Sequence, residues 1–108
     1  QSADIDMGLM SAASVVTAAH GLAGGPSFVQ IYAKCQVADG GFAVGDMLLM
    51  GTSGTTNNNR GATVMVNATQ VTVIRGSAGI DLNNKSTGTY FVATLSSWRW
   101  IVRCFKIA

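Results

Sequence analysis

From residue 28 onward, apolar and polar residues alternate with a period of two along several segments of the chain. The clearest case is 28–36, where Val29, Ile31 and Ala33 share one face while Gln30 and Lys34 lie on the other. This period is typical of a β-strand that has one face in the core. Further predicted strands, bounded by Gly, Asn or Asp, are 47–50, 62–66, 70–75, 90–93 and 98–107.

The first third of the chain has a less distinct pattern. Its apolar residues between 12 and 19 suit a helix or a strand, but the β-branched run at 14–17 and the turn signal of Gly24, Gly25 and Pro26 favour a strand. About six or seven short strands joined by turns predict an all-β fold, an antiparallel, jelly-roll-like β-sandwich. We assign 12–108 to the sandwich domain and 1–11 to an N-terminal connecting segment.

Few charged residues are available to cover the surface of such a domain. Of 108 residues, 11% are charged and 48% are hydrophobic, and Glu is absent. This composition excludes most disordered proteins and coiled coils, and no apolar run is long enough for a membrane span. The net charge of +2 is small and its carriers are scattered, which argues against a nucleic-acid partner. Because a small domain exposes much of its chain, we expect a homo-oligomer that covers apolar surface.

The last predicted strand has two different faces. The face suited to a core carries Trp98, Trp100, Val102 and Cys104. The face suited to a subunit contact carries Arg99, Ile101, Arg103, Phe105 and Ile107. Mixed aromatic and basic residues are also typical of single-stranded nucleic-acid binding, but the strict alternation favours a core and a subunit contact.

Two cysteines and one histidine are candidates for special chemistry. Cys35 and Cys104 lie in predicted strands without metal-ligand spacing, so we expect buried thiols, with a disulfide between them as the alternative. His20 precedes Gly21 and Leu22, so we expect it to fix a turn by hydrogen bonding. The alternative is a metal site formed by three copies of His20 on a symmetry axis.

The sequence is poor in groups that catalysis requires. Asp39 and Asp46 form the only carboxylate pair in the middle of the chain, and each stands next to a glycine. We expect both to cap turns rather than to act as the paired acids of a glycosidase. With one His, no nucleophile motif and no phosphate-binding loop, the sequence predicts a protein that is not an enzyme and has no cofactor or resident metal.

The polar segment 51–61 is longer than a hairpin turn requires and rich in Thr and Asn. Long loops on rigid sandwiches often carry recognition. We therefore predict a receptor-binding site at Asn57, Asn58, Asn59 and Arg60, in which Arg60 donates the strongest hydrogen bonds. The alternative is that these residues only solvate a connection between strands.

Four short motifs occur in an order that resembles a known family. They are His20-Gly21-Leu22, the strand residues 26–30, the segment 41–46 and the Trp-Arg-containing final strand at 98–103. Together they resemble the C-terminal β-rich domain of bacteriophage tail fibre and related virion proteins, from about residue 12 onward. The chain departs from the family pattern at Met47, where an acidic residue is expected after Asp46.

The resemblance implies a trimeric β-sandwich in the virion whose exposed loops meet the host surface. The implied partners are two further copies of the chain, other virion proteins and a host cell-surface glycan or protein. A capsid decoration or head-fibre protein is the first alternative, because it would show the same uncharged, β-rich composition. A free sugar-binding lectin is the second, because Asn, Arg and aromatic side chains also recognise sugars.

Overall fold

The structure is a computed structural model that describes residues 2–50 and 59–107. A short 3-10 helix, η2 (Leu95–Ser97), precedes the last strand. The strands are β1 (Ser2–Leu9), β2 (Val15–Ala19), β3 (Phe28–Cys35), β4 (Met47–Leu49), β5 (Ala62–Val66), β6 (Gln70–Arg75), β7 (Asp81–Asn83), β8 (Tyr90–Val92) and β9 (Trp98–Phe105). None of the described helical turns is long and apolar enough to cross a membrane.

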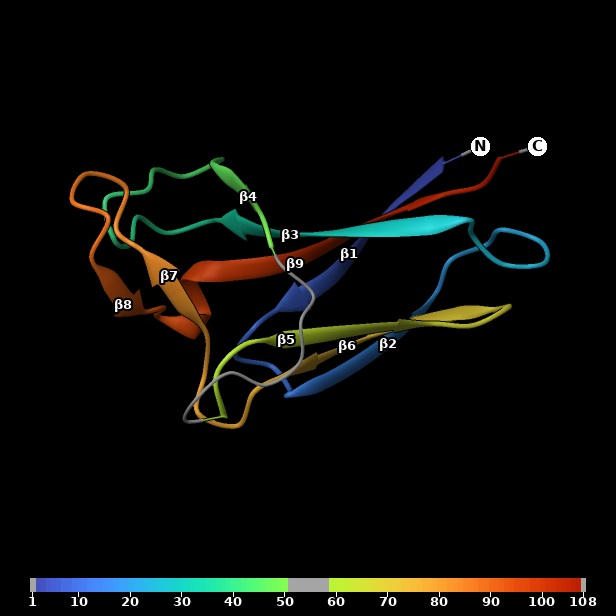
Figure 1. The fold of residues 1–108 in the computed structure, drawn as a ribbon, viewed down its shortest axis with the longest axis horizontal. Helices are drawn as coiled ribbons and strands as arrows, with labels where there is room; N and C mark the ends of the chain where they lie inside the picture. Colours follow the sequence, from blue (N-terminus) through green and yellow to red (C-terminus); the bar gives the residue numbers. More distant parts are fainter. Residues whose placement is uncertain (1, 51–58, 108) are drawn as a thin grey trace.

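The strands form two main antiparallel sheets that face each other (Figure 1). The four-stranded sheet has the order β1-β9-β3-β4, and the three-stranded sheet has the order β2-β6-β5. The hairpin of β7 and β8 lies at one end of the long axis. The chain crosses between the main sheets after β1, β2 and β4, as chains do in jelly-roll sandwiches. The predicted all-β antiparallel sandwich is therefore confirmed.

The core lies between the two main sheets and uses the alternation of β3 and β9. Ile31, Ala33 and Cys35 face inward from β3, and all three are fully buried. Trp98 and Trp100 of β9 are 0% and 1% exposed and supply the largest buried side chains. The predicted inward face of the last strand is therefore confirmed. The ring of Phe42 packs edge-on against Trp98, with 5.6 Å between their centroids, and such pairs stabilise aromatic cores.

The expectation that 1–11 only connects the domain to something else is wrong for most of that segment. Residues Ser2–Leu9 form β1, an edge strand paired with β9 over its whole length. Its side chains alternate, because Ile5 and Met7 turn toward the core while Asp4 and Asp6 remain exposed. The sequence pattern did not predict this strand, because the ion-pair partners of its two aspartates lie on β9, almost a full chain length away.

The other strand predictions hold to within one or two residues, with one omission. Strand β7, only three residues long, lies between the predicted strands 70–75 and 90–93, where we predicted no strand. The ambiguous first third contains β2, which confirms the strand and excludes the helix. Short strands such as β7 carry too few residues for a period to be recognised.

The two cysteines are free and buried. In the register of β3 and β9, Cys35 stands opposite Trp98 while Cys104 stands opposite Val29. Six strand positions therefore separate the two thiols, about 20 Å at the rise of a β-strand. This separation excludes the disulfide that the sequence left open, because a disulfide needs Cα atoms within about 7 Å. Burial raises the pKa of both thiols.

Candidate functional site

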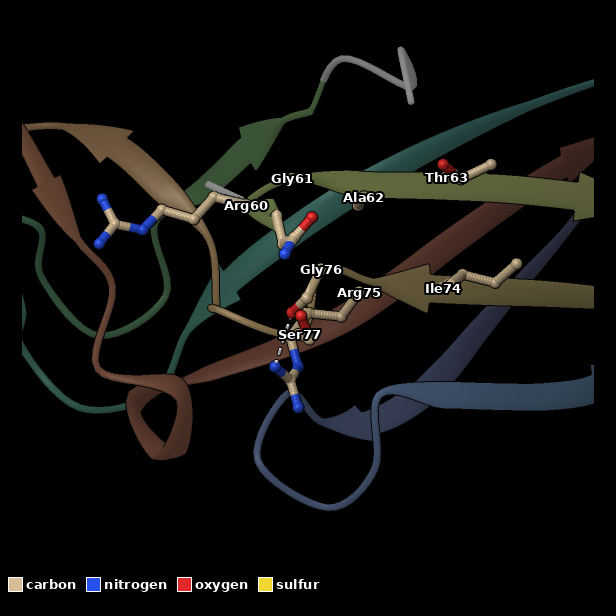
Figure 2. Close-up of a pocket in the computed structure, with 9 residues that line it drawn as sticks. Arg60, Gly61, Ala62, Thr63, Ile74, Arg75, Gly76 and Ser77 are labelled. Atoms are coloured by element: carbon tan, nitrogen blue, oxygen red, sulfur yellow. Dashed lines mark hydrogen bonds between the residues drawn. The ribbon is translucent and has the colours of Figure 1, made fainter. Parts of the chain in front are cut away.

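Of the four predicted receptor-binding residues, Asn59 and Arg60 are described, while Asn57 and Asn58 lie outside the described residues. Asn59 and Arg60 stand just before β5 and line a pocket of about 210 Å³ (Figure 2). The lining continues along the first residues of β5 and the last residues of β6. The remaining members are Gly61, Ala62, Thr63, Ile74, Arg75, Gly76 and Ser77.

Backbone contacts between two segments fix the wall of this pocket. Asn59 adopts a left-handed conformation with φ 57°, and its carbonyl oxygen accepts a hydrogen bond from the Ala78 N–H at 3.0 Å. The Gly76 N–H donates to the Gly61 carbonyl at 2.7 Å. A Cβ added to Gly76 would stand 2.2 Å from the Asn59 carbonyl oxygen. Only glycine allows this approach, so Asn59 is held in place by the end of β6.

Both arginines in the lining are engaged with protein groups. Arg60 donates to the Asp81 carboxylate at 3.4 Å, and Figure 2 shows its guanidinium directed away from Thr63 and Ile74. Arg75 donates through Nε to the Met10 carbonyl and through a terminal nitrogen to the Gly76 carbonyl, each at 3.0 Å. Both arginines thus bond to groups within the chain, and a contact of Arg60 with a receptor stays a prediction.

Beside the two arginines, the lining also carries uncharged side chains. Asn59, Thr63 and Ser77 supply amide and hydroxyl groups to the lining, and Ile74 supplies an apolar surface. Such a set can bind a polar, uncharged molecule by hydrogen bonds and by contact with its apolar side. The described lining contains no acid, base or nucleophile with an activating partner.

One end of the sandwich holds the start of β1 and the end of β9 (Figure 1). Strand β1 begins and β9 ends side by side, with Ser2 paired to Phe105. The start of β5 and the end of β6, which carry the pocket, are at the opposite end of the long axis, on the side of β7 and β8. The long axis of the domain measures 42 Å. A neighbour attached through either chain end would therefore leave the pocket accessible.

His20 fixes a turn, as predicted. Its Nδ1 accepts a hydrogen bond from the Leu22 N–H at 3.0 Å, and its Nε2 lies 3.0 Å from the Asn67 carbonyl. Because a carbonyl only accepts, Nε2 is the donor in this bond. Both nitrogens of this buried ring are engaged within one chain, which argues against the metal site on a symmetry axis. The described residues contain no group of three potential metal-binding side chains.

The two mid-chain aspartates have different roles. Asp46 caps its turn by accepting from the Ala43 N–H at 3.0 Å, as predicted, and also binds Lys85 at 3.2 Å. The Ala43 bond and then Lys85 lower the pKa of Asp46. The prediction is wrong for Asp39, because its carboxylate reaches the Thr94 N–H at 2.8 Å and the Trp98 indole N–H at 3.0 Å. Asp39 thereby satisfies the polar atom of a core tryptophan.

A second polar surface, which the sequence did not indicate, covers the outside of the four-stranded sheet. Arg103 donates to Asp4 at 2.7 Å, and Arg99 donates to Asp6 at 3.0 Å. The Arg103 bond lowers the pKa of Asp4, and Asp4 in turn raises the pKa of Arg103. Partial burial opposes ionisation of Asp6, but bonds from Arg99 and the Gly8 N–H outweigh it and lower its pKa.

Side chains on this outer face contact one another within the chain, and the subunit contact predicted for the last strand stays a prediction. Phe105 stacks on Phe28 within the chain, with 4.5 Å between ring centroids, and Arg103 lies 5.4 Å from the centre of the Tyr32 ring. The side chains are thus largely occupied with one another. A shallow hollow of about 220 Å³ lies between the charged pairs, Lys34 and Met47. Only the register of β1, β3 and β9 could have revealed this cluster.

Comparison of the chain with protein-family models, with curated proteins and with solved structures found no match.

Proposed function

We propose that this protein is a non-enzymatic phage virion component, a tail fibre or receptor-binding tip that attaches the particle to the host surface. The observation that carries the proposal is the placement of a pocket, with walls fixed by backbone hydrogen bonds, at the end of the sandwich opposite Ser2 and Phe105. This arrangement suits a module held at one end and recognising a surface with the other. The motif order that resembles tail-fibre domains supports the assignment to a virion.

Recognition is favoured over catalysis by the state of the reactive side chains. The His20 ring bonds to Leu22 and Asn67, and the Asp39 carboxylate bonds to Thr94 and Trp98. These groups hold the structure together and do not converge on the pocket. A neutral lining of amide, hydroxyl and aliphatic groups is well suited to the hydroxyls and apolar faces of a host glycan.

Exposed apolar side chains support the trimeric part of the proposal. Leu49 is 63% exposed, Val15 55% and Met65 52%, all on the outer faces of the sandwich. A chain with so few charges has little other means of keeping such residues out of water than contact with further copies.

The position of the protein on the particle is the first test. Antibodies raised against the purified chain are bound to intact phage particles and visualised by immunogold electron microscopy. We expect label at the distal end of the tail. Label spread over the head would instead identify a capsid decoration or head-fibre protein, and particles without label would leave the free lectin as the better reading.

Competition for host cells is the second test. Purified protein should slow adsorption of the same phage, and the Asn59→Gly/Ser77→Ala variant should lose most of that competition. Glycine at 59 preserves the left-handed backbone, so the change removes side-chain groups alone. The matched control is Thr69→Ala at the opposite end, which should compete like wild type. Equal competition by all three proteins would remove the pocket from host recognition.

A further inference from the structure

Strand β8 carries the most exposed aromatic side chain among the described residues, Tyr90, which is 65% exposed. In the register of the β7–β8 hairpin, Asn83 stands directly opposite Tyr90, and Asp81 stands opposite Val92. All four residues are exposed. Because residues directly opposite each other lie on one face of a strand pair, these four form a single outward surface, which we call the hairpin surface.

The other face of the hairpin is anchored to the domain. Leu82 is buried, and the Phe91 ring packs so closely on Gly40 that a Cβ at this glycine has no room. The Lys85 N–H also donates to the Gly40 carbonyl at 3.0 Å. The hairpin therefore presents Tyr90 on a fixed base, so that little conformational freedom is lost when a ligand binds.

The hairpin surface is continuous with the pocket at the start of β5. Arg60, which lines the pocket, donates to the Asp81 carboxylate at 3.4 Å, and the Gly61 N–H donates to the Gly79 carbonyl at 3.2 Å. From Asp81 to Asn83 the strand advances by about 7 Å. Both regions lie at the same end of the long axis (Figure 1). One short oligosaccharide can therefore contact the pocket and the hairpin surface together.

The hairpin surface combines a flat apolar ring with hydrogen-bonding groups. Tyr90 supplies the ring, and the Asn83 amide can both donate and accept. The ion pair of Asp81 with Arg60 adds a carboxylate and a guanidinium. A pyranose ring matches this set, because it has an apolar face of C–H groups and hydroxyls around its rim. An extended peptide matches it less well, because β8 has only three residues with which a peptide strand could pair.

We infer that the hairpin surface is a second subsite of the receptor-binding site, in which a pyranose ring stacks on Tyr90 and its hydroxyls bond to Asn83. The inference rests on the proposed recognition of the host and deepens it, because it names the sugar ring as the ligand and Tyr90 as its main contact. This subsite lies outside the segment 51–61, in which the sequence predicted receptor binding.

Fluorescently labelled protein is bound to cells of the phage's host and measured by flow cytometry. The proteins are wild type, Tyr90→Ala, Tyr90→Phe and the matched control Phe28→Ala. Phe28 is also an exposed aromatic residue, at 50%, but it pairs with Phe105 at the opposite end of the domain. Tyr90→Ala should raise the half-saturating concentration about tenfold, which corresponds to a loss of about 1.4 kcal/mol. Tyr90→Phe keeps the ring, so it and Phe28→Ala should bind within about twofold of wild type.

The chemical class of the ligand is tested by treating the host cells before binding. Periodate opens sugar rings that carry neighbouring hydroxyls, whereas protease removes surface proteins. Binding of wild type should fall roughly tenfold or more after periodate treatment, whether or not protease also lowers it. Undiminished binding to periodate-treated cells would overturn the sugar subsite, and loss after protease alone would identify a protein as the partner.

Wild type that binds host cells, together with Tyr90→Ala that binds equally well, would overturn the inference and leave the proposed function intact. Wild type that does not bind would overturn both. Near-ultraviolet circular dichroism of Trp98 and Trp100 reports whether each variant is folded. If Tyr90→Ala does not fold, Asn83→Ala decides: it should raise the half-saturating concentration about threefold through loss of a hydrogen bond, and an unchanged value would overturn the inference.

Discussion

The four-stranded and three-stranded sheets use the same alternation of apolar and polar positions but are stabilised on the outside by different means. The four-stranded sheet joins its strands with ion pairs, an aromatic stack and the contact of Arg103 with Tyr32. The three-stranded sheet has a threonine pair, Thr63, Gln70 and aliphatic side chains there, and no charged side chain. One outer face therefore pairs its charged side chains within the chain, and the other leaves the apolar side chains of Val15, Met65 and Ile74 exposed.

The two main sheets also satisfy their buried polar groups in different ways. In the four-stranded sheet the Trp98 indole N–H lies in the core and depends on Asp39, which stands outside the strands. In the three-stranded sheet the hydroxyl of Thr72 pairs with the adjacent strand. We therefore expect the loss of one polar partner to lower the free energy of unfolding more in the four-stranded sheet than in the three-stranded sheet.

The largest effect is expected for Asp39→Ala. This change leaves the buried Trp98 indole and the Thr94 N–H without their acceptor, and an unsatisfied buried donor costs about 1–3 kcal/mol. Urea unfolding followed by tryptophan fluorescence measures the loss. The control is Asp46→Ala, which removes an exposed turn cap and should lower the free energy of unfolding less. Equal losses for the two variants would show that the Asp39–Trp98 hydrogen bond stabilises the protein no more than the Asp46 turn cap does.

A smaller effect is expected for Thr72→Val in the three-stranded sheet. The variant removes the hydrogen bond between Thr72 and Thr17 and should lower the free energy of unfolding by about 0.5–1.5 kcal/mol. The double variant Thr17→Val/Thr72→Val should recover much of this loss, because two aliphatic groups then face each other. A double variant as unstable as the sum of both single changes would contradict the assignment of the loss to this bond.

The smallest effect is expected from acid. The pKa values of Asp4, Asp6 and Asp46 are lowered in the folded chain. A carboxyl with a lowered folded pKa stabilises the protein above its unfolded pKa, near 4, and that contribution is lost as pH falls through the folded pKa. The free energy of unfolding should therefore decline below about pH 4.

The acid response should come in part from the four-stranded sheet. In Asp4→Asn/Asp6→Asn the decline below about pH 4 should be shallower, whereas Thr72→Val should leave its slope unchanged. Salt should weaken the decline in wild type, because exposed ion pairs are screened. An identical slope in wild type and the double aspartate variant would show that these pairs do not couple to folding.

The length and composition of 51–61 predicted a receptor-binding site at Asn57, Asn58, Asn59 and Arg60, and receptor binding there stays a prediction. In the structure Asn59 and Arg60 line a pocket. Arg60 also pairs with Asp81, a contact that the sequence did not predict. Asp81 belongs to β7, a strand too short to recognise, so the sequence contained no sign of this pairing.

The sequence by itself determined the antiparallel sandwich, the strands from 28 onward and the inward faces of β3 and β9. Local alternation suffices for these, because a period of two fixes which side chains share a face. Tertiary structure alone decided that Ser2–Leu9 is an edge strand and that the two cysteines stay apart. It also decided that Asp39 accepts the hydrogen bond of the Trp98 indole, and that only one of the two main sheets has an outer face without charged side chains. Each of these depends on strand order and register, which bring together residues far apart in the chain and leave no local pattern.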